Sequence, residues 1–411
     1  MLRKTETDNP AKTASTRLVA LDRARSFITL LVLIHHSAVN YTHFGNGDKM
    51  RWLGFDLVVL FNDSFFMACM FLISGLFVHD NLTHRGAADF LRDRVWRLGI
   101  PFLVSIFVLM PIAYYPTFLR YHLPGTTDFN FFHFWWRTLT VGPWPSGPAW
   151  FLWVLLALDI VAAVLLTLAP RMLKIFGLLI FSLRDRPWTA FVAFLAFSVA
   201  VYVPMRLFVG DMRWLEPDGF PLPIQTSRIL LYAGYFLIGV GIGVVSLRAG
   251  ILSEEGALAR RWPRWLAFAS LFYGAILLMV YAHHNWIADF DKPPLSWQTG
   301  YSLVFALFSA AMTFTVLAVS LAFASSNMKL LDAMRPSAYG IFLTHYIFIL
   351  WLQYAVYDYS WPAVVKFAVV FAGTLALSWA VTWLLRRIPV VARMIQSESM
   401  HLTGLDHASS A

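Results

Sequence analysis

The chain has 411 residues, of which 59% are hydrophobic and only 13% are charged. An ordinary soluble domain carries roughly a quarter charged residues, so this composition excludes a soluble globular protein and indicates a chain that uses lipid as its solvent. The formal net charge is +9, and the single cysteine, Cys69, excludes a disulfide within one chain.

Ten long apolar stretches follow one another along the chain, each close to the roughly 20 residues that a membrane-spanning helix needs. They lie near 21–43, 57–79, 98–118, 148–169, 188–209, 229–248, 265–283, 298–324, 337–357 and 362–386. The aromatic segment from Phe129 to Val141 is too short to span and predicts a helix at the membrane interface. The sequence therefore predicts an all-α polytopic membrane protein with about ten transmembrane helices.

Most of the 32 lysines and arginines lie before the first stretch or in the loops after the second, fourth, sixth, eighth and tenth. Because positive residues accumulate on the cytoplasmic side, this alternation predicts that the N- and C-termini are both cytoplasmic. It also explains the basic charge without nucleic acid as a partner. We expect a polar cytoplasmic tail over 1–16, without the apolar core of a signal peptide, a membrane domain over 17–387, and a cytoplasmic tail over 388–411.

The first stretch carries ionisable residues on one helical face. Arg25 and His36 are eleven positions apart, which places them within roughly 20° of the same face and about 16 Å apart along the axis. Asp22 lies on the same stripe, whereas His35 is about 100° away from it. An ionisable residue inside a membrane helix indicates function, and histidine suits proton transfer near neutral pH. The alternative is that His36 only forms a hydrogen bond between helices.

Four landmarks follow in a defined order along the chain. They are Leu21-Asp22 with Arg25 and His36, an aromatic run from Phe65 that ends in Ser74-Gly75, the Arg94-Val95-Trp96-Arg97 segment before Pro101, and the stretch from Ser337 to His345. Singly none of them is specific, but together, over residues 17–387, they resemble the acyltransferase-3 family of bacterial membrane proteins.

The resemblance implies a membrane O-acyltransferase in the bacterial cytoplasmic (inner) membrane. Such an enzyme moves an acyl group, of the acetyl or succinyl class, from cytoplasmic acyl-CoA to a hydroxyl of an envelope glycan or another extracytoplasmic carbohydrate. Branches that modify O-antigen or peptidoglycan carry a glutamate at the position of Leu155. The chain therefore looks closer to the stand-alone branch that includes the periplasmic glucan biosynthesis protein C.

Acyl transfer to a hydroxyl needs a base, a held donor and a stabilised oxyanion. We predict His36 as the base, with Arg25 and Asp22 as further catalytic residues. Arginine forks suit the phosphates of the donor, so Arg25 is also expected at the cytoplasmic mouth. The other predicted donor-binding residues are Arg92, Arg94, Arg97 and Ser74. The alternative for the arginines is that topology alone places them at inner helix ends.

For the acceptor, the predicted binding residues are Asp63, Trp150, Asp159, Tyr339 and His345. Tryptophan can stack on a sugar ring, although an interfacial aromatic belt is the alternative for it, and a buried structural role is the alternative for the aspartates. We expect no metal site, because the histidines form no i, i+4 group with a carboxylate.

A transporter of a small solute or a lipid-linked sugar is the main alternative function. Many transporters contain internal repeats with broken helices at matching positions, and no repeat is visible here. The crowding of polar residues into the first three stretches favours the enzyme.

Overall fold

The computed structural model describes residues 10–395 except 46, 122–129, 143–145, 211–213, 216–222, 246–249, 254–255, 288 and 290–291. Almost all regular structure in this part of the chain is helical, as expected. The exception is a two-stranded antiparallel sheet of β1 (Trp214–Leu215) and β2 (Ile224–Gln225), in which Trp214 lies opposite Gln225.

The helices follow the expected stretches with several breaks. They are α1 (Pro10–Val39), α2 (Leu53–Asp63), α3 (Phe66–Gly75), α4 (Val78–Arg85), α5 (Ala87–Arg94), η1 (Val95–Gly99), α6 (Ile100–Val104), η2 (Ser105–Leu109), α7 (Met110–Tyr121), α8 (Phe131–Thr140), η3 (Gly147–Ala149), α9 (Trp150–Leu168), α10 (Pro170–Ser182), α11 (Pro187–Val209), η4 (Thr226–Arg228), α12 (Ile229–Val245), α13 (Ala257–Arg260), α14 (Trp262–Trp286), α15 (Leu295–Ala322), α16 (Lys329–Met334), α17 (Ala338–Val356), α18 (Ala363–Leu385) and α19 (Pro389–Ile395).

Eight helical segments in the described chain are long and apolar enough to cross a membrane: Leu53–Arg85, Ala87–Tyr121, Gly147–Leu168, Pro187–Val209, Thr226–Val245, Trp262–Trp286, Leu295–Ala322 and Ala363–Leu385. The two other expected spans correspond to α1, which holds charged residues and two histidines, and α17, which holds His345 and Gln353. Helix α1 packs against α2, α3, α15, α17 and α18, so its polar side chains are enclosed by the bundle. The chain is a polytopic all-α membrane protein.

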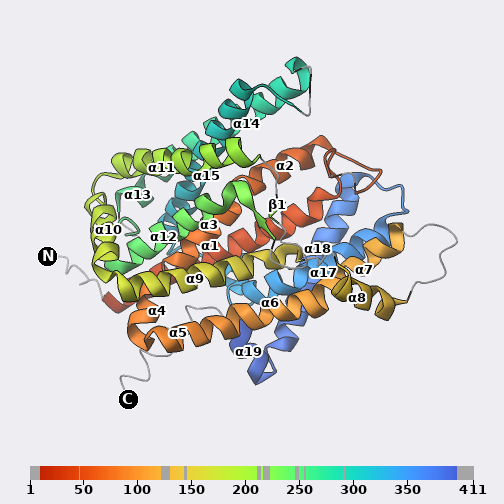
Figure 1. Cartoon of the computed structure of the whole chain (residues 1–411), viewed down its shortest axis with the longest axis horizontal. Coiled ribbons are helices and arrows are strands. Elements are labelled where there is room, and N and C mark those ends of the chain that lie inside the picture. Colours follow the sequence, from red (N-terminus) through yellow and green to blue (C-terminus); the bar gives the residue numbers. More distant parts are fainter. Residues whose placement is uncertain are drawn as a thin grey trace, which may run out of the picture.

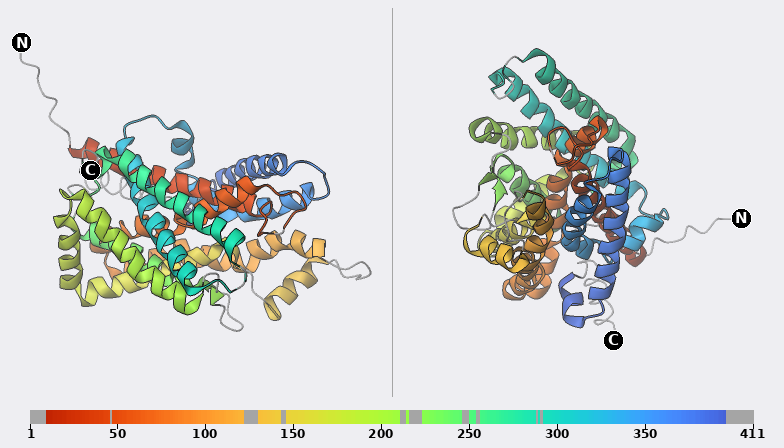
Figure 2. Two further views of the ribbon diagram at one scale, coloured as in Figure 1. Left: turned by 90° about the horizontal axis from the view of Figure 1, so that it is seen from above. Right: turned by 90° about the vertical axis from the view of Figure 1, so that its right-hand side faces the viewer.

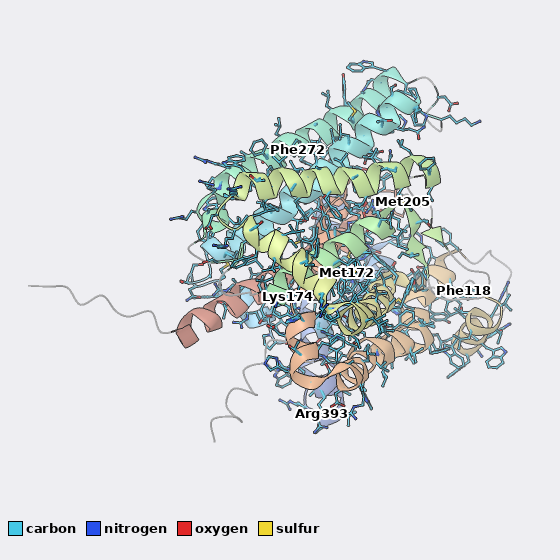
Figure 3. The ribbon with its side chains drawn as sticks, turned by 60° about the vertical axis from the view of Figure 1, so that its left-hand side comes forward. Phe118, Met172, Lys174, Met205, Phe272 and Arg393 are labelled. Atoms are coloured by element: carbon cyan, nitrogen blue, oxygen red, sulfur yellow. The ribbon has the colours of Figure 1, made fainter. Side chains whose placement is uncertain are left out.

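Most long helices run along the long axis of Figure 1, and α10 lies across them at the end where α1 begins, as both Figure 1 and the left view of Figure 2 show. Helix α10 was not predicted; its exposed Met172 and Lys174 are labelled in Figure 3. Parts of the two expected tails are helical. Helix α1 already begins at Pro10 and α19 occupies Pro389–Ile395, while 1–9 and 396–411 lie outside the described residues.

Contacts in the middle of α1 and beyond its C-terminal end fix its register in the bundle. In the middle of α1, Arg23 donates two hydrogen bonds to the Asp332 carboxylate, 2.6 and 2.8 Å long, and another to the Ala324 carbonyl at 2.7 Å. Beyond the C-terminal end of α1, Lys366 Nζ lies 2.9 Å from the nearer carboxylate oxygen of Asp48. These polar contacts are largely buried, and they hold the functional stripe of α1 in place.

Glycines allow α3 to pack directly on α12. A Cβ atom at Gly75 would lie 2.1 Å from the Phe236 carbonyl oxygen, and one at Gly239 would lie 2.2 Å from the Leu72 carbonyl oxygen. Any side chain at these positions would push the two backbones apart. This close approach orients α3 so that Ser74, one residue before Gly75, lines the cavity described next.

Candidate active site

A cavity of about 100 Å³ lies between α1, α3, α5, η1, α9 and α17. We call it the arginine cavity because its charged lining residues are Asp22, Arg25, Arg94, Arg97 and Arg335. The remaining wall is mainly apolar. Four guanidinium groups against one carboxylate in the lining create a positive field, which suits an anionic ligand.

Carboxylates hold the arginines of this cavity in place. Asp22 lies between Arg25 and Arg335, with nitrogen–oxygen distances of 3.7 and 3.5 Å respectively. Arg94 Nε lies 3.2 Å from Asp159 Oδ2, and both side chains are almost fully buried. Because each arginine is fixed by a neighbour, the cluster is organised before any ligand arrives.

A π-helical turn, η1, carries Arg97 into the cavity directly after α5 ends at Arg94. Such wider turns change the direction in which successive side chains point and recur at functional sites. The turn is held from the opposite side, because the Tyr339 hydroxyl donates a hydrogen bond to the Arg97 carbonyl oxygen. Helices α5 and α17 thus meet at this cavity.

A second cavity, of about 110 Å³, lies farther along α1. We call it the histidine cavity because His35 and His36 both line it, together with Asp63, Trp150 and Tyr232. The two histidines point about 100° apart, so the cavity covers a wide sector of the helix. Trp150 and Tyr232 stack with ring centres 5.7 Å apart, and they form one aromatic side of the cavity.

His36 lies in a group of aromatic and imidazole rings. Its ring centre is 5.5 Å from that of His345 and 5.3 Å from that of Tyr346. His345 Nδ1 lies 2.6 Å from the Phe342 carbonyl oxygen. A carbonyl only accepts, so this nitrogen carries the proton, and Nε2 of the neutral ring is an acceptor. That Nε2 is buried and has no hydrogen-bond partner among the described residues.

An ion pair anchors the far side of the histidine cavity. Arg228 Nη2 lies 2.6 Å from Asp63 Oδ2, and Arg228 Nη1 donates to the Asp63 backbone carbonyl at 2.9 Å. Arg228 is buried at the end of η4, directly before α12, whereas Asp63 ends α2. The pair links these two helices and fixes the carboxylate that faces the cavity.

Phe342 on α17 is shared by the linings of both cavities. Along α1, Asp22, Arg25 and Thr29 line the arginine cavity, and His36 lines the histidine cavity. The stripe predicted from helical spacing therefore runs from one cavity to the other. A ligand held by the arginines would reach His36 by passing Phe342.

Three predicted binding residues lie elsewhere than expected. Asp159 was predicted for the acceptor, but it pairs with Arg94 behind the arginine cavity. Tyr339, also predicted for the acceptor, lines the arginine cavity instead. Arg92 was predicted for the donor beside Arg94 and Arg97, yet it does not line the arginine cavity, and its exposed side chain pairs with Asp89 at 3.0 Å. Helical spacing turns Arg92 away from the face that Arg94 occupies.

The structure places the other predicted residues in or beside the two cavities. Ser74 lines the arginine cavity, Asp63 and Trp150 line the histidine cavity, and His345 lies beside His36.

Sequence reasoning missed Arg228 and Arg335 as site residues. Arg228 had a signal, because it lies at the expected outer side, where the positive-inside rule disfavours arginine. No sequence signal marked Arg335, because the positive-inside rule already predicts an arginine at an inner helix end. Phe342 falls within the landmark that ends at His345, but the landmark does not reveal that its ring separates two cavities.

These features define a polytopic membrane protein whose helix bundle encloses two polar cavities on one helix. The family model described as an acyltransferase domain matches residues 18–383, which is nearly the whole chain. The chain therefore belongs to this family and is a membrane acyltransferase, an enzyme that transfers groups other than aminoacyl groups. No curated protein sequence matches it.

Proposed function

We propose that this enzyme transfers an acyl group, of the acetyl or succinyl class, from cytoplasmic acyl-CoA to a hydroxyl of an envelope glycan or another extracytoplasmic carbohydrate. The observation that carries the proposal is the pair of cavities on α1, one lined by arginines and one by histidines, with Phe342 between them. The membrane is the bacterial cytoplasmic membrane, with the arginine cavity toward the cytoplasm. Leu155, which lines that cavity, supports the stand-alone branch of the family.

The arginine cavity suits the donor. Acyl-CoA carries a pyrophosphate, and Arg25, Arg94, Arg97 and Arg335 offer several guanidinium groups to it. The apolar part of the wall suits the uncharged pantetheine arm that follows the pyrophosphate. The thioester at the end of this arm would then be directed along α1 toward Phe342 and His36.

The reaction needs one proton acceptor and no change of oxidation state. As the acceptor oxygen attacks the thioester carbonyl, His36 takes the hydroxyl proton, and the new carbon–oxygen bond forms. When the carbon–sulfur bond breaks, the imidazolium of His36 returns the proton to the leaving thiolate. The products are the ester and free coenzyme A. His345, whose ring centre lies 5.5 Å from that of His36, would orient the His36 ring by accepting a hydrogen bond at Nε2.

The histidine cavity suits a carbohydrate. The Trp150 and Tyr232 rings offer aromatic surface for the C–H face of a sugar, and the Asp63 carboxylate offers an acceptor for its hydroxyls. Because Arg228 holds Asp63, the carboxylate needs little reorganisation to receive a ligand.

The proposal is tested with purified protein in liposomes, radiolabelled acetyl-CoA or succinyl-CoA, and glycans extracted from the cell envelope. Wild-type protein should release coenzyme A and acylate the glycan, and His36→Ala should do neither. His284→Ala is the matched control, because His284 is exposed on α14. Unchanged coenzyme A release by folded His36→Ala protein would overturn the proposal. So would solute uptake without thioester cleavage, which is the behaviour of a transporter.

A further inference from the structure

A third and larger cavity, of about 950 Å³, adjoins the arginine cavity. We call it the C-terminal cavity because α19 forms one side and the segment from α4 to η1 forms the other. Arg97 lines both this cavity and the arginine cavity, so the two are neighbours across one side chain. A ligand whose pyrophosphate lies at Arg97 can therefore extend into the C-terminal cavity.

The C-terminal cavity carries an excess of positive charge. Four arginines line it, Arg85, Arg92, Arg97 and Arg393, against two carboxylates, Asp89 and Asp93. The carboxylates are already engaged: Asp89 pairs with Arg92 at 3.0 Å, and Asp93 lies 3.6 Å from Arg85 and 3.7 Å from Arg97. Arg393 differs from these three arginines, because no carboxylate of the described chain pairs with it.

Arg393 and Trp96 face this cavity from opposite sides. Figure 3 labels Arg393 on the outside of the molecule, and its helix α19 packs against η1. Trp96 belongs to η1, which packs against α19, and 47% of its surface is exposed although its neighbour Arg97 is buried. An exposed indole beside arginines is a surface on which a nucleobase can stack.

We propose that the C-terminal cavity binds the adenosine 3′-phosphate end of the donor coenzyme A. Arg393 contacts the 3′-phosphate, Trp96 stacks on the adenine, and Arg97 links this subsite to the pyrophosphate in the arginine cavity. The inference rests on the proposed use of acyl-CoA and adds to it the place of the nucleotide. It also gives α19, which lies in the expected cytoplasmic tail, a role in donor recognition.

The experiment compares three donors with the reconstituted protein: acetyl-CoA, acetyl-dephospho-CoA, which lacks the 3′-phosphate, and S-acetyl-pantetheine, which lacks the nucleotide. Wild-type protein should have the lowest KM for acetyl-CoA. Arg393→Ala should raise the KM for acetyl-CoA about ten- to hundredfold, the range of one charge-assisted contact, and leave both truncated donors unchanged. Trp96→Ala should raise the KM for acetyl-CoA and acetyl-dephospho-CoA alike and spare S-acetyl-pantetheine.

Arg387→Ala is the control variant, because Arg387 precedes α19 and its guanidinium carbon lies 3.7 Å from the centre of the Trp383 ring. It should leave all three donors unchanged. The inference is overturned if Arg393→Ala affects acetyl-CoA and acetyl-dephospho-CoA equally. It is also overturned if the effect depends only on the phosphatidylglycerol content of the liposomes, which would make the cavity a lipid-headgroup site. If wild-type protein uses none of the donors, the proposed function fails instead.

Discussion

The arginine cavity and the histidine cavity lie along the same helix, but they use charge differently. In the first, guanidinium groups are positioned by Asp22 and Asp159 and remain in excess over the lining carboxylates. In the second, the nearby arginine, Arg228, is bound to Asp63, and the groups next to His36 are uncharged rings or a second imidazole. An excess of fixed charge suits binding of a polyanion, whereas an imidazole among uncharged neighbours suits reversible proton transfer. The difference indicates that binding and chemistry are separated along α1.

The largest effect is expected from His36, since it is the group assigned to proton transfer. His36→Ala should lower kcat by about 10²–10⁴-fold, the usual contribution of a positioned general base. The dissociation constant for coenzyme A should stay unchanged, because the arginine cavity is intact. Calorimetry with coenzyme A, the product that cannot react further, measures this constant, and rapid-quench kinetics measure kcat. Equal losses in binding and kcat would mean that the two cavities are not functionally distinct.

Arg94 tests whether the arginine cavity binds the donor. Arg94→Ala should raise the KM for the donor about tenfold or more and should also lower thermal stability, because it leaves the Asp159 carboxylate buried without a partner, at a cost of about 3–5 kcal/mol. Adding Asp159→Asn should recover most of the stability and none of the donor affinity.

Lys174→Ala is the matched control for Arg94→Ala, since it removes a positive charge from the exposed side of α10. It should change neither the donor KM nor the thermal stability. If the double variant regains wild-type KM, Arg94 affects the donor only through folding.

Phe342 tests whether the two cavities need to be separate. Phe342→Ala should join them, admit water to the thioester, and raise acceptor-independent hydrolysis of acetyl-CoA several-fold relative to transfer. Phe342→Leu fills most of the space and is the control. Release of coenzyme A without glycan is the readout. If Phe342→Ala leaves the ratio of hydrolysis to transfer at the wild-type value, the ring is not a barrier.

The sequence predicts which residues of this site share one face of a single helix. It does not predict the ion pairs that join residues of two different helices. Arg25 and His36 share a face because helical geometry alone fixes their relation, and both line the cavities. The Arg228–Asp63 pair joins residues 165 positions apart, and the Arg335–Asp22 pair joins residues 313 apart. Those contacts depend on how helices pack against one another, which apolar periodicity does not encode.

In the fold, too, features of a single helix are predicted and features that depend on packing are not. The length of an apolar stretch predicts a membrane span well, because the thickness of the membrane sets that length. It does not predict α10, which lies across the bundle, or α19, which borders the C-terminal cavity. Both helices take their positions from tertiary contacts with α12 and η1 respectively. The Arg94–Asp159 pair was not predicted for a similar reason, since the two residues lie on different helices.

The smallest effect on activity is expected outside both cavities, at the ion pair that ties α1 to α16. The Arg23 hydrogen bonds lower the pKa of the Asp332 carboxyl below its ordinary value. A lowered pKa in the folded state means that the carboxylate stabilises the fold above its ordinary pKa, and that this contribution is lost as the pH falls through the folded-state value. Asp332→Asn should therefore lower the free energy of unfolding by about 1–3 kcal/mol at pH 7, because it weakens the hydrogen bonds of a buried arginine.

The difference in Tm between Asp332→Asn and wild type should shrink as the pH is lowered toward the folded-state pKa, because the wild-type carboxyl then becomes protonated as well. Asp185→Asn is the control: Asp185 is 79% exposed beside Arg184, so its replacement should change the Tm little at any pH. Both variants should keep the wild-type kcat and donor KM, since neither residue lines a cavity. A Tm difference that is the same at every pH would show that Asp332 acts through packing and not through its charge.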